Sequence, residues 1–273
     1  MIRRLPVALA IAALVGADLS SASAQAPFVA PEFYNRTRPD FGQTLPMCVL
    51  PDSPTLDLDR RVAEIIAESL LLEPKIVVLD VNMDALDHEG IWPDVLVHLS
   101  ESCVGMVGTK LIDGYLYPDW LIPTAPYLTA PYVLISNDGY GSLDELPEGA
   151  AIGSPIYTQI DGQLLSYIAT GAMPGARRLP YDRPELAEQL LEDGAIDAAI
   201  IWAPYLSGAN AVDGAAYSAI GTVEPLRPGT QSLGIALRSS DQMLRGTFDQ
   251  VIDVLDSDPE IGRLKQIARA EDL

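Results

Sequence analysis

The strongest constraint on the fold is a strand–helix–strand–helix–strand alternation in the first half of the chain. Short apolar runs at residues 46–50, 76–79 and 103–107 predict buried strands. Residues 62–72 carry apolar side chains at helical spacing, and Pro93 is well placed as the first residue of a second helix. Such alternation predicts a parallel sheet with right-handed crossovers, in which the first and third strands can lie side by side.

A second alternating set follows residues 108–131, where Gly, Pro and aromatic residues interrupt the first set. Residues 132–135 predict a strand that leads out of the first set, and residues 233–237 predict a strand that returns to it. Further strands are predicted at 150–153, 177–181 and 197–202, and helices at 157–170, from Asp182 to Gly194, after Ser240 to about residue 255, and over about 259–270. The predicted helix N-caps are Asp57 or Asp59, Asp182, and Ser239 or Ser240.

Two α/β sets joined by an outgoing and a return strand indicate two lobes, with a ligand cleft between them. The expected fold class is α/β, with a mostly parallel sheet flanked by helices in each lobe and two crossing strands between the lobes. The predicted segments are a signal peptide at 1–24, an N-terminal arm at 25–45, a first lobe from 46–131 and 233–273, and a second lobe with the hinge crossings from 132–232.

The first 24 residues have the composition of an export signal. Arg3 and Arg4 form the basic segment, residues 5–15 the apolar segment, and Ala22-Ser23-Ala24 the cleavage site. The apolar run is short for a membrane span, and no later stretch reaches roughly 18 uninterrupted apolar residues. We therefore expect a periplasmic or secreted protein that does not insert into the membrane after cleavage, with an uncleaved anchor as the alternative.

The chain is strongly acidic, with 17 Lys and Arg residues against 38 Asp and Glu residues. Removal of the leader, with Arg3, Arg4 and Asp18, leaves 15 basic and 37 acidic residues and a net charge of −22. Such a charge repels phosphate backbones and makes nucleic acid a poor partner. The negative charge favours a cation or a basic protein as partner. Alternatively, it only keeps the surface solvated. With 48% hydrophobic residues, the chain can bury a large core.

Cys48 and Cys103 are the only cysteines, and each lies in or beside a short apolar run. In an exported protein such a pair is most simply a disulfide. A bridge that closes so long a loop can stabilise the fold by roughly 3 to 4 kcal/mol. Because the two runs are the predicted first and third strands, a bridge suits strand ends that are neighbours.

The sequence lacks the short motifs that mark common enzyme classes. It has no Gly-x-Ser-x-Gly elbow, His-Glu-x-x-His run, phosphate-binding loop or Gly-x-Gly-x-x-Gly fingerprint. His88 and His98 are the only histidines, and for both we expect a surface or core position and no part in catalysis or metal ligation. The sequence therefore predicts a protein that is not an enzyme and holds no cofactor.

One acidic segment partly matches a calcium loop. Asp80, Asn82 and Asp84 copy its first three ligand positions, but Ala85 stands where glycine is needed and Ile91 where a bidentate glutamate belongs. We therefore predict a solvated acidic loop and no metal, with these three residues, together with Asp87 and Glu89, as the alternative for a weak cation site.

Several polar and aromatic residues lie where α/β sheets place their ligands, at strand ends and helix starts. Residues 154–158 follow a strand and open a helix, so their free N–H groups could receive an anionic or carbonyl oxygen. The candidates chosen on this basis are Trp92, Tyr127, Ser154, Tyr157, Thr158, Trp202 and Tyr205. Ordinary capping and boundary packing is the alternative for each of them.

Five segments give the chain a resemblance to the family 3 extracellular solute-binding proteins of the polar amino acid type. These segments are Gly108-Thr109-Lys110, Thr124-Ala125-Pro126-Tyr127, and residues 142–146, 191–198 and 233–237. The resemblance covers most of residues 46–270 and implies the two-lobed type II periplasmic-binding fold. It also adds Thr109 and Lys110 to the candidate cleft residues.

Two departures separate the chain from amino acid binders of that family. Lys110 and Leu111 stand where the family usually places an arginine shortly after the Gly-Thr pair. Trp202 stands where an aspartate usually ends the strand. Without these partners for an α-carboxylate and an α-ammonium, the resemblance implies a less polar ligand or none.

A narrower resemblance is to the binding-protein-like accessory proteins encoded with PQQ-dependent methanol and other alcohol dehydrogenases. It rests on Cys48 in the first strand, Cys103 opening the third, and Trp202-Ala203-Pro204 after a Gly-x-x-Asp strand. The first interpretation is therefore a non-catalytic periplasmic accessory protein whose partner is such a dehydrogenase or its cytochrome. The alternative is the ligand-binding component of an ABC transporter, with a small, weakly polar solute and a permease as partners. An enzyme on the same fold is a further alternative.

Overall fold

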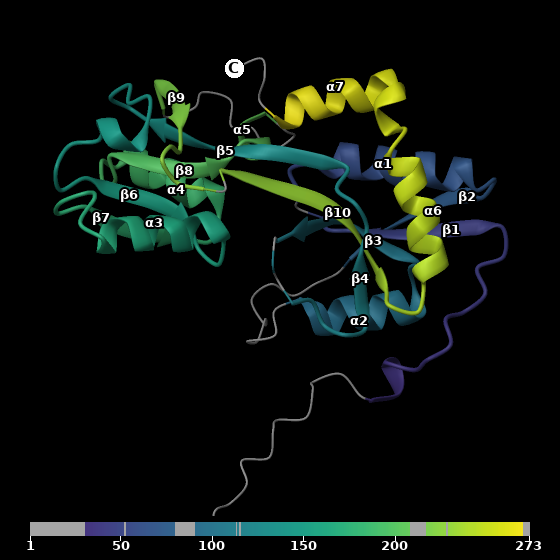
Figure 1. Cartoon of the computed structure of the whole chain (residues 1–273). Helices are drawn as coiled ribbons and strands as arrows, with labels where there is room; N and C mark the ends of the chain where they lie inside the picture. Colours follow the sequence, from purple (N-terminus) through teal and green to yellow (C-terminus); the bar gives the residue numbers. More distant parts are fainter. Residues whose placement is uncertain are drawn as a thin grey trace, which may run out of the picture.

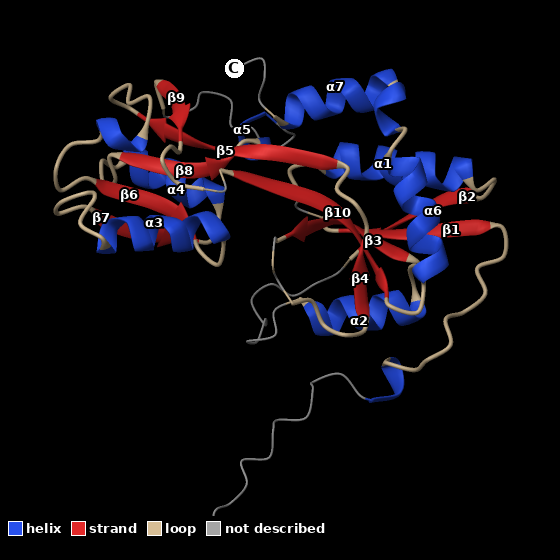
Figure 2. Ribbon diagram, in the orientation of Figure 1, coloured by secondary structure: helices blue, strands red, loops and turns tan. Residues whose placement is uncertain are grey.

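The computed structural model describes residues 31–51, 53–79, 91–112, 114, 116–207, 217–227 and 229–269. The strands of this part form one ten-stranded sheet in the order β2-β1-β3-β10-β5-β8-β6-β7, with β4 paired to β10 and β9 to β5. Helices flank the sheet in two separate groups (Figures 1 and 2). We call the group around β1–β3 half A and the group around β6–β8 half B.

Half A begins with the alternation that the sequence predicts. Its elements are β1 (Thr44–Val49), α1 (Leu56–Ser69), β2 (Glu73–Val78), α2 (Trp92–Glu101), β3 (Gly105–Leu111) and β4 (Leu121–Pro123). β1 pairs in parallel with both β2 and β3, so the first and third strands are neighbours as predicted. Five of the six residues of β1 are buried, because helices cover both faces of this central strand.

Cys48 in β1 and Cys103 just before β3 form the predicted disulfide, with their Cα atoms 5.7 Å apart. Both cysteines are fully buried beneath α2, beside Val95 and Leu99. The bridge therefore belongs to the core of half A.

Half B contains a second parallel set. Its elements are η3 (Leu143–Glu145), β6 (Ala151–Pro155), α3 (Gln159–Ala169), β7 (Arg177–Tyr181), α4 (Pro184–Glu192), β8 (Ala198–Trp202), α5 (Pro204–Ser207) and β9 (Ala219–Thr222). β6 lies between β7 and β8 and is parallel to both. All five residues of β8 are buried, which explains why this strand reads as an uninterrupted apolar run.

Two long strands join the halves, β5 (Leu128–Ser136) and β10 (Thr230–Arg238). The first residues of β5 pair with β10, and from Tyr132 onward β5 pairs with β8 and β9. β10 then runs antiparallel to β3 in half A. Each of these strands therefore links the two groups of elements (Figure 1).

The chain returns to half A in α6 (Gln242–Ile252), η4 (Leu255–Ser257) and α7 (Pro259–Ala268). α7 packs on α1 and also contacts α5 of half B. Near its end, Arg269 Nε donates a hydrogen bond to the Thr129 carbonyl of β5 at 3.1 Å. The last helix thus spans the joint between the halves, above β5 in Figure 1.

One continuous cluster of buried side chains runs through both halves. It includes Val62 and Ile66 of α1, Tyr132 of β5, Ile152 of β6 and Phe248 of α6. Two smaller clusters lie on the opposite faces, one under α2 in half A and one under α4 in half B. Apolar side chains are therefore buried on both faces of the sheet.

The N-terminal arm packs against half A through its arginines. Arg38 donates to Asp241 Oδ2 at 2.6 Å and to the Leu99 carbonyl at 3.0 Å. Arg238 donates to the carbonyl of Arg36 at 2.7 Å. η1 (Pro31–Phe33) lies in this arm, and the Phe33 carbonyl accepts a bond from Ser100.

Several predicted N-caps are wrong. The helices begin after Thr55, Arg183 and Asp241, and none of these side chains accepts a capping bond. Asp59, a predicted cap of α1, lies inside the helix, and its side chain is fully buried. The sequence prediction also omits β4, β9 and α5, which are short and lie in Gly- and Pro-rich stretches.

Candidate functional site

Side chains from both halves meet where the crossing strands join them. Lys110 lies near the end of β3, beside Leu233 of β10, and Trp202 ends β8, opposite Tyr132 of β5. The Lys110 Nζ lies 5.7 Å from the centroid of the Trp202 ring. This cation–π contact joins half A to half B at the joint.

The Lys110 side chain is exposed to solvent, yet protein surrounds it closely. This desolvation lowers the pKa of its ammonium. Within the part of the chain that the structure describes, no carboxylate lies within ion-pair distance of its Nζ. An accessible but crowded ammonium without a counter-charge is suited to receive an anionic group.

Trp202 is almost fully buried, and its ring contacts the Lys110 ammonium. Its Nε1 donates to the Ala130 carbonyl at 3.2 Å, and its ring meets that of Tyr205 edge-on at 6.1 Å. Tyr132 is also buried, and burial together with the nearby Tyr205 raises its pKa well above the usual range, so its hydroxyl stays neutral. The base of the joint is therefore aromatic.

Tyr127 lies inside half A, and its hydroxyl donates to Asp59 Oδ1 at 2.5 Å. Ser53 and Thr55 donate to Oδ2 of the same carboxylate at 2.9 and 3.0 Å. Because burial outweighs these bonds, the pKa of Asp59 is raised from 3.8 to about 6. These residues are bonded to the middle of β3, since the Gly108 N–H donates to the Tyr127 hydroxyl at 2.9 Å.

Ser154 is fully buried at the end of β6, and its Oγ donates to Asp161 Oδ1 at 2.5 Å. Arg178 binds the same carboxylate through two nitrogens, at 2.5 and 2.6 Å. Thr158 caps α3, since its Oγ1 accepts from the Asp161 N–H at 3.3 Å and donates to the Pro155 carbonyl. These polar groups are paired with one another and build the start of α3.

The remaining described candidates lie in different environments. Thr109 is buried, and its hydroxyl donates to the Met106 carbonyl at 2.9 Å. Tyr157 is 93% exposed, with a φ of 63° before α3. Trp92 begins α2 and meets Tyr117 edge-on at 6.0 Å. The structure thus brings together Lys110, Trp202 and Tyr205, with Thr158 beside Tyr132.

Asp80, Asn82, Asp84 and His88 lie outside the described residues, as do the predicted signal peptide and the first residues of the arm. Among the residues that are described, no cluster of His, Cys, Asp and Glu could hold a metal ion. In the same part, no helix is both long enough and apolar enough to cross a bilayer.

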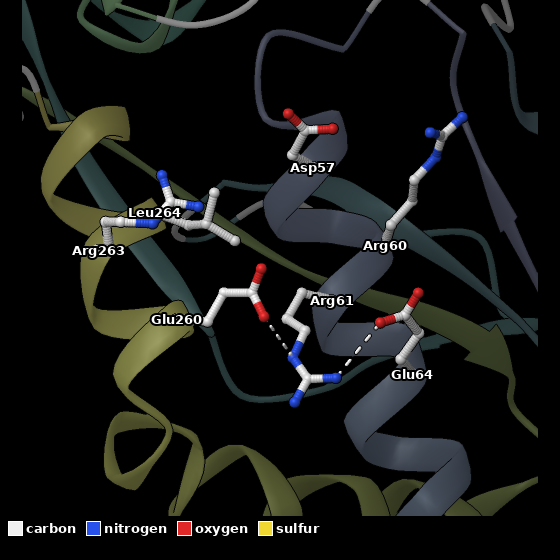
Figure 3. Close-up of a pocket in the computed structure, with 7 residues that line it drawn as sticks. All are labelled: Asp57, Arg60, Arg61, Glu64, Glu260, Arg263 and Leu264. Carbon is white, nitrogen blue, oxygen red and sulfur yellow. Dashed lines mark hydrogen bonds and ion pairs between the residues drawn. The ribbon is translucent and has the colours of Figure 1, made fainter.

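A hollow with a volume of ≈ 260 Å³ lies on the surface between α1 and α7 (Figure 3). At its base Arg61 bridges the helices by pairing with Glu64 at 3.3 Å, Glu260 at 3.4 Å and Asp258 at 2.8 Å. These pairs raise the pKa of Arg61. The charges of this pocket hold two helices together, which sets it apart from the unpaired Lys110.

Sequence reasoning missed Asp59, Asp161 and Arg178, although each organises a candidate residue. The side-chain bonds Ser154–Asp161, Arg178–Asp161 and Tyr127–Asp59 join residues 7, 17 and 68 positions apart, so no local motif marks them. The one available signal is an acidic residue on the apolar stripe of a predicted helix, which applies to Asp161 in the helix predicted at 157–170.

No family model matches the sequence, and a search of curated proteins found no match. The fold, however, is shared with solved structures. The second substrate-binding domain of Lactococcus lactis GlnP, in an open conformation, has a TM-score of 0.59 and 15% identity, over 85% of this chain and 97% of that one. An amino acid ABC transporter substrate-binding protein of Streptococcus pneumoniae, bound to L-arginine, has a TM-score of 0.55 and 20% identity, over 83% and 94%.

An ancestral amino acid-binding protein, a precursor of cyclohexadienyl dehydratase, has a TM-score of 0.53 and 16% identity over 83% of this chain and 96% of that one. Together these similarities show that the chain has the type II periplasmic-binding fold, as the resemblance of its sequence predicts. The similar structures are mostly non-catalytic binding proteins. At such low identity they establish the fold alone, and function has to be argued from this chain's own residues.

Proposed function

We propose that the protein binds a small solute between its halves as the ligand-binding component of an ABC transporter. The observation that carries this proposal is the convergence of Lys110 from half A and Trp202 from half B at the joint. We take the halves to be the predicted lobes, 46–131 with 233–273, and 132–232. A ligand there would contact both lobes, so that binding favours their closure.

Three features support this reading. The similar structures described above are substrate-binding proteins of amino acid transporters, one of them in an open conformation. The crossing strands are the natural hinge, because few other segments pass between the halves. The predicted signal peptide would deliver the protein to the periplasm, where its partners are the solute and a permease.

Native mass spectrometry of the protein purified from its own periplasm tests the proposal. We expect a bound small molecule, and small-angle X-ray scattering should give a smaller radius of gyration with ligand than without. At a concentration of about 100 Kd the ligand should stabilise the fold by about 2.7 kcal/mol. Absence of any bound mass, with no thermal shift across a solute library, would refute a binding function. N-terminal sequencing should begin at Gln25 if the leader is cleaved as predicted.

A second candidate is the accessory role beside a PQQ-dependent alcohol dehydrogenase. The observations that favour it are the Cys48–Cys103 disulfide, Trp202-Ala203-Pro204 and the acidic charge, which suits a basic partner. The similar structures support the transport reading better, since their descriptions concern amino acid transport.

Pull-down from periplasmic extract separates the two candidates. An accessory protein should capture a dehydrogenase or its cytochrome at low salt and release it as salt rises, because the attraction is electrostatic. Unchanged dehydrogenase activity and maturation in a deletion strain would exclude this role.

Binding without catalysis is part of the proposal. Of the two histidines, His98 lies on α2, away from the joint, and His88 lies outside the described residues. Asp161 is neutralised by Arg178, and Asp59 is buried behind Gly108, so neither carboxylate meets a ligand at Lys110. A dehydratase assay on the purified protein checks this directly, and any turnover would contradict it.

A further inference from the structure

We propose that Lys110 is the anion-binding residue of the proposed ligand site at the joint and that the ligand is a small organic carboxylate that carries no ammonium group. This inference rests on the proposed binding function and adds to it the chemical class of the solute. It follows from the charges at the joint, taken one by one.

Lys110 has the geometry of an anion receptor. Its side chain is exposed, and its ammonium is held 5.7 Å above the Trp202 ring. Trp202 is itself fixed, because its Nε1 donates to the Ala130 carbonyl across the joint. An ammonium positioned in this way loses little side-chain freedom when it pairs with an anion, so more of the attraction remains as affinity.

The nearby carboxylates are already neutralised or screened. Asp161 receives two bonds from Arg178 and one from Ser154, and only 10% of its side chain is exposed. Asp59 receives three hydroxyl bonds behind β3 and is fully buried. In the described part of the chain, therefore, neither group can serve as the counter-ion of Lys110 or as the receptor of a ligand ammonium.

In the described part of the chain, aromatic rings and neutral hydroxyls lie next to Trp202, and a second cation, Arg269, donates to the Thr129 carbonyl at the joint. Tyr205 packs edge-on to Trp202, and Tyr132 is buried beside Thr158 with a neutral hydroxyl. Such a surface suits an apolar carbon skeleton next to the carboxylate. An α-amino acid would bring its ammonium close to that of Lys110 with no acidic partner among the described residues, and this repulsion disfavours it.

The test uses sets of three compounds with the same carbon skeleton, and the mature protein as it is exported. One set is 3-phenylpropanoate, 3-phenylpropanamide and L-phenylalanine, another is hexanoate, hexanamide and L-norleucine, and further sets vary the chain length. Binding is measured by isothermal titration calorimetry for the wild type and for Lys110→Met, Lys110→Arg and Lys75→Met. Lys75 is exposed on the edge strand β2, so its variant removes the same charge from half A without touching the joint.

We expect at least one carboxylate to bind at least about tenfold more tightly than its amide and its amino acid. Lys110→Met should weaken that binding by about tenfold to a hundredfold, Lys110→Arg should retain most of it, and Lys75→Met should leave it unchanged. Equal thermal melts of the variants would show that the fold is intact.

The remaining outcomes overturn the inference in distinguishable ways. If an amide or an amino acid binds as well as the carboxylate, or if Lys110→Met binds like the wild type, the ligand class is wrong and the binding function stands. If native mass spectrometry instead finds a bound molecule without an acidic group, the same conclusion holds. If no compound binds and no native ligand is found, the binding function itself fails.

Discussion

Replacing Asp59 with asparagine should remove a pH dependence of folding that the wild-type protein carries. The Asp59 carboxylate is fully buried and has no cationic partner among its bonds, which come from Tyr127, Ser53 and Thr55. Burial raises its pKa from 3.8 to about 6. The folded protein therefore holds a proton on Asp59 more tightly than the unfolded chain does.

The magnitude follows from the two pKa values. A rise from 3.8 to about 6 corresponds to about 3 kcal/mol of stability that is fully present below the lower value and is lost as the pH rises through the higher one. About 2 kcal/mol of this falls between about pH 4.5 and about pH 7.5. The asparagine side chain of the variant cannot ionise, and its amide can accept from Tyr127 while donating to the Ser53 and Thr55 hydroxyls.

Urea unfolding of the wild type and of Asp59→Asn at a series of pH values measures the unfolding free energy of each protein. Other carboxylates affect both proteins equally, so the difference in unfolding free energy isolates Asp59. The wild type should lose about 2 kcal/mol relative to the variant as the pH rises across that range. A difference that stays constant, or one that favours the wild type at high pH, would refute the reasoning.

Three further changes test the scaffold. Replacing Cys48 and Cys103 together with serine should lower the unfolding free energy by about 4 kcal/mol, measured in urea, since the bridge closes a separation of 55 residues; a loss below about 1 kcal/mol would contradict this. Arg178→Met should cost about 3 kcal/mol, because it leaves the Asp161 carboxylate buried without its cation; a melting temperature equal to the wild type's would count against the pairing. Gly108→Ala should destabilise by about 2 kcal/mol, because the φ of +82° disfavours a side chain and a Cβ would meet a carboxylate oxygen at 2.9 Å; an equal or raised melting temperature would show that the site relaxes.

The parts of the fold that the sequence predicts are those determined by local pattern. Residues 177–181 are predicted as a strand with the bounds that β7 has, because turns flank a short, regular run. β9 could not be predicted in this way. Its four residues form a strand because they pair with β5, and one of them, Gly221, packs against the backbone of Gly141. Such contacts between distant segments leave no local pattern.

Some residues of the candidate site can likewise be predicted from local pattern, and others cannot. Trp202 and Tyr205 can be chosen from sequence because they end or follow a predicted strand, and Lys110 can be chosen because of the resemblance to the solute-binding family. Tyr127 and Ser154 satisfy the same rule, yet the structure turns them inward to buried carboxylates. Which polar residue faces a cleft depends on partners supplied by other elements, and a single sequence does not reveal them.

The pairing of β3 with β10 also has a consequence for folding during synthesis. Half A is assembled from two stretches of chain, and the edge of β3 is covered only when residues 230–238 arrive. A chain that ends before them would present an open, apolar strand edge next to an incomplete core, a template for aggregation. The chain therefore benefits from a chaperone or a delay in folding until residues 230–238 have emerged, whereas half B is continuous and can fold as soon as it is complete.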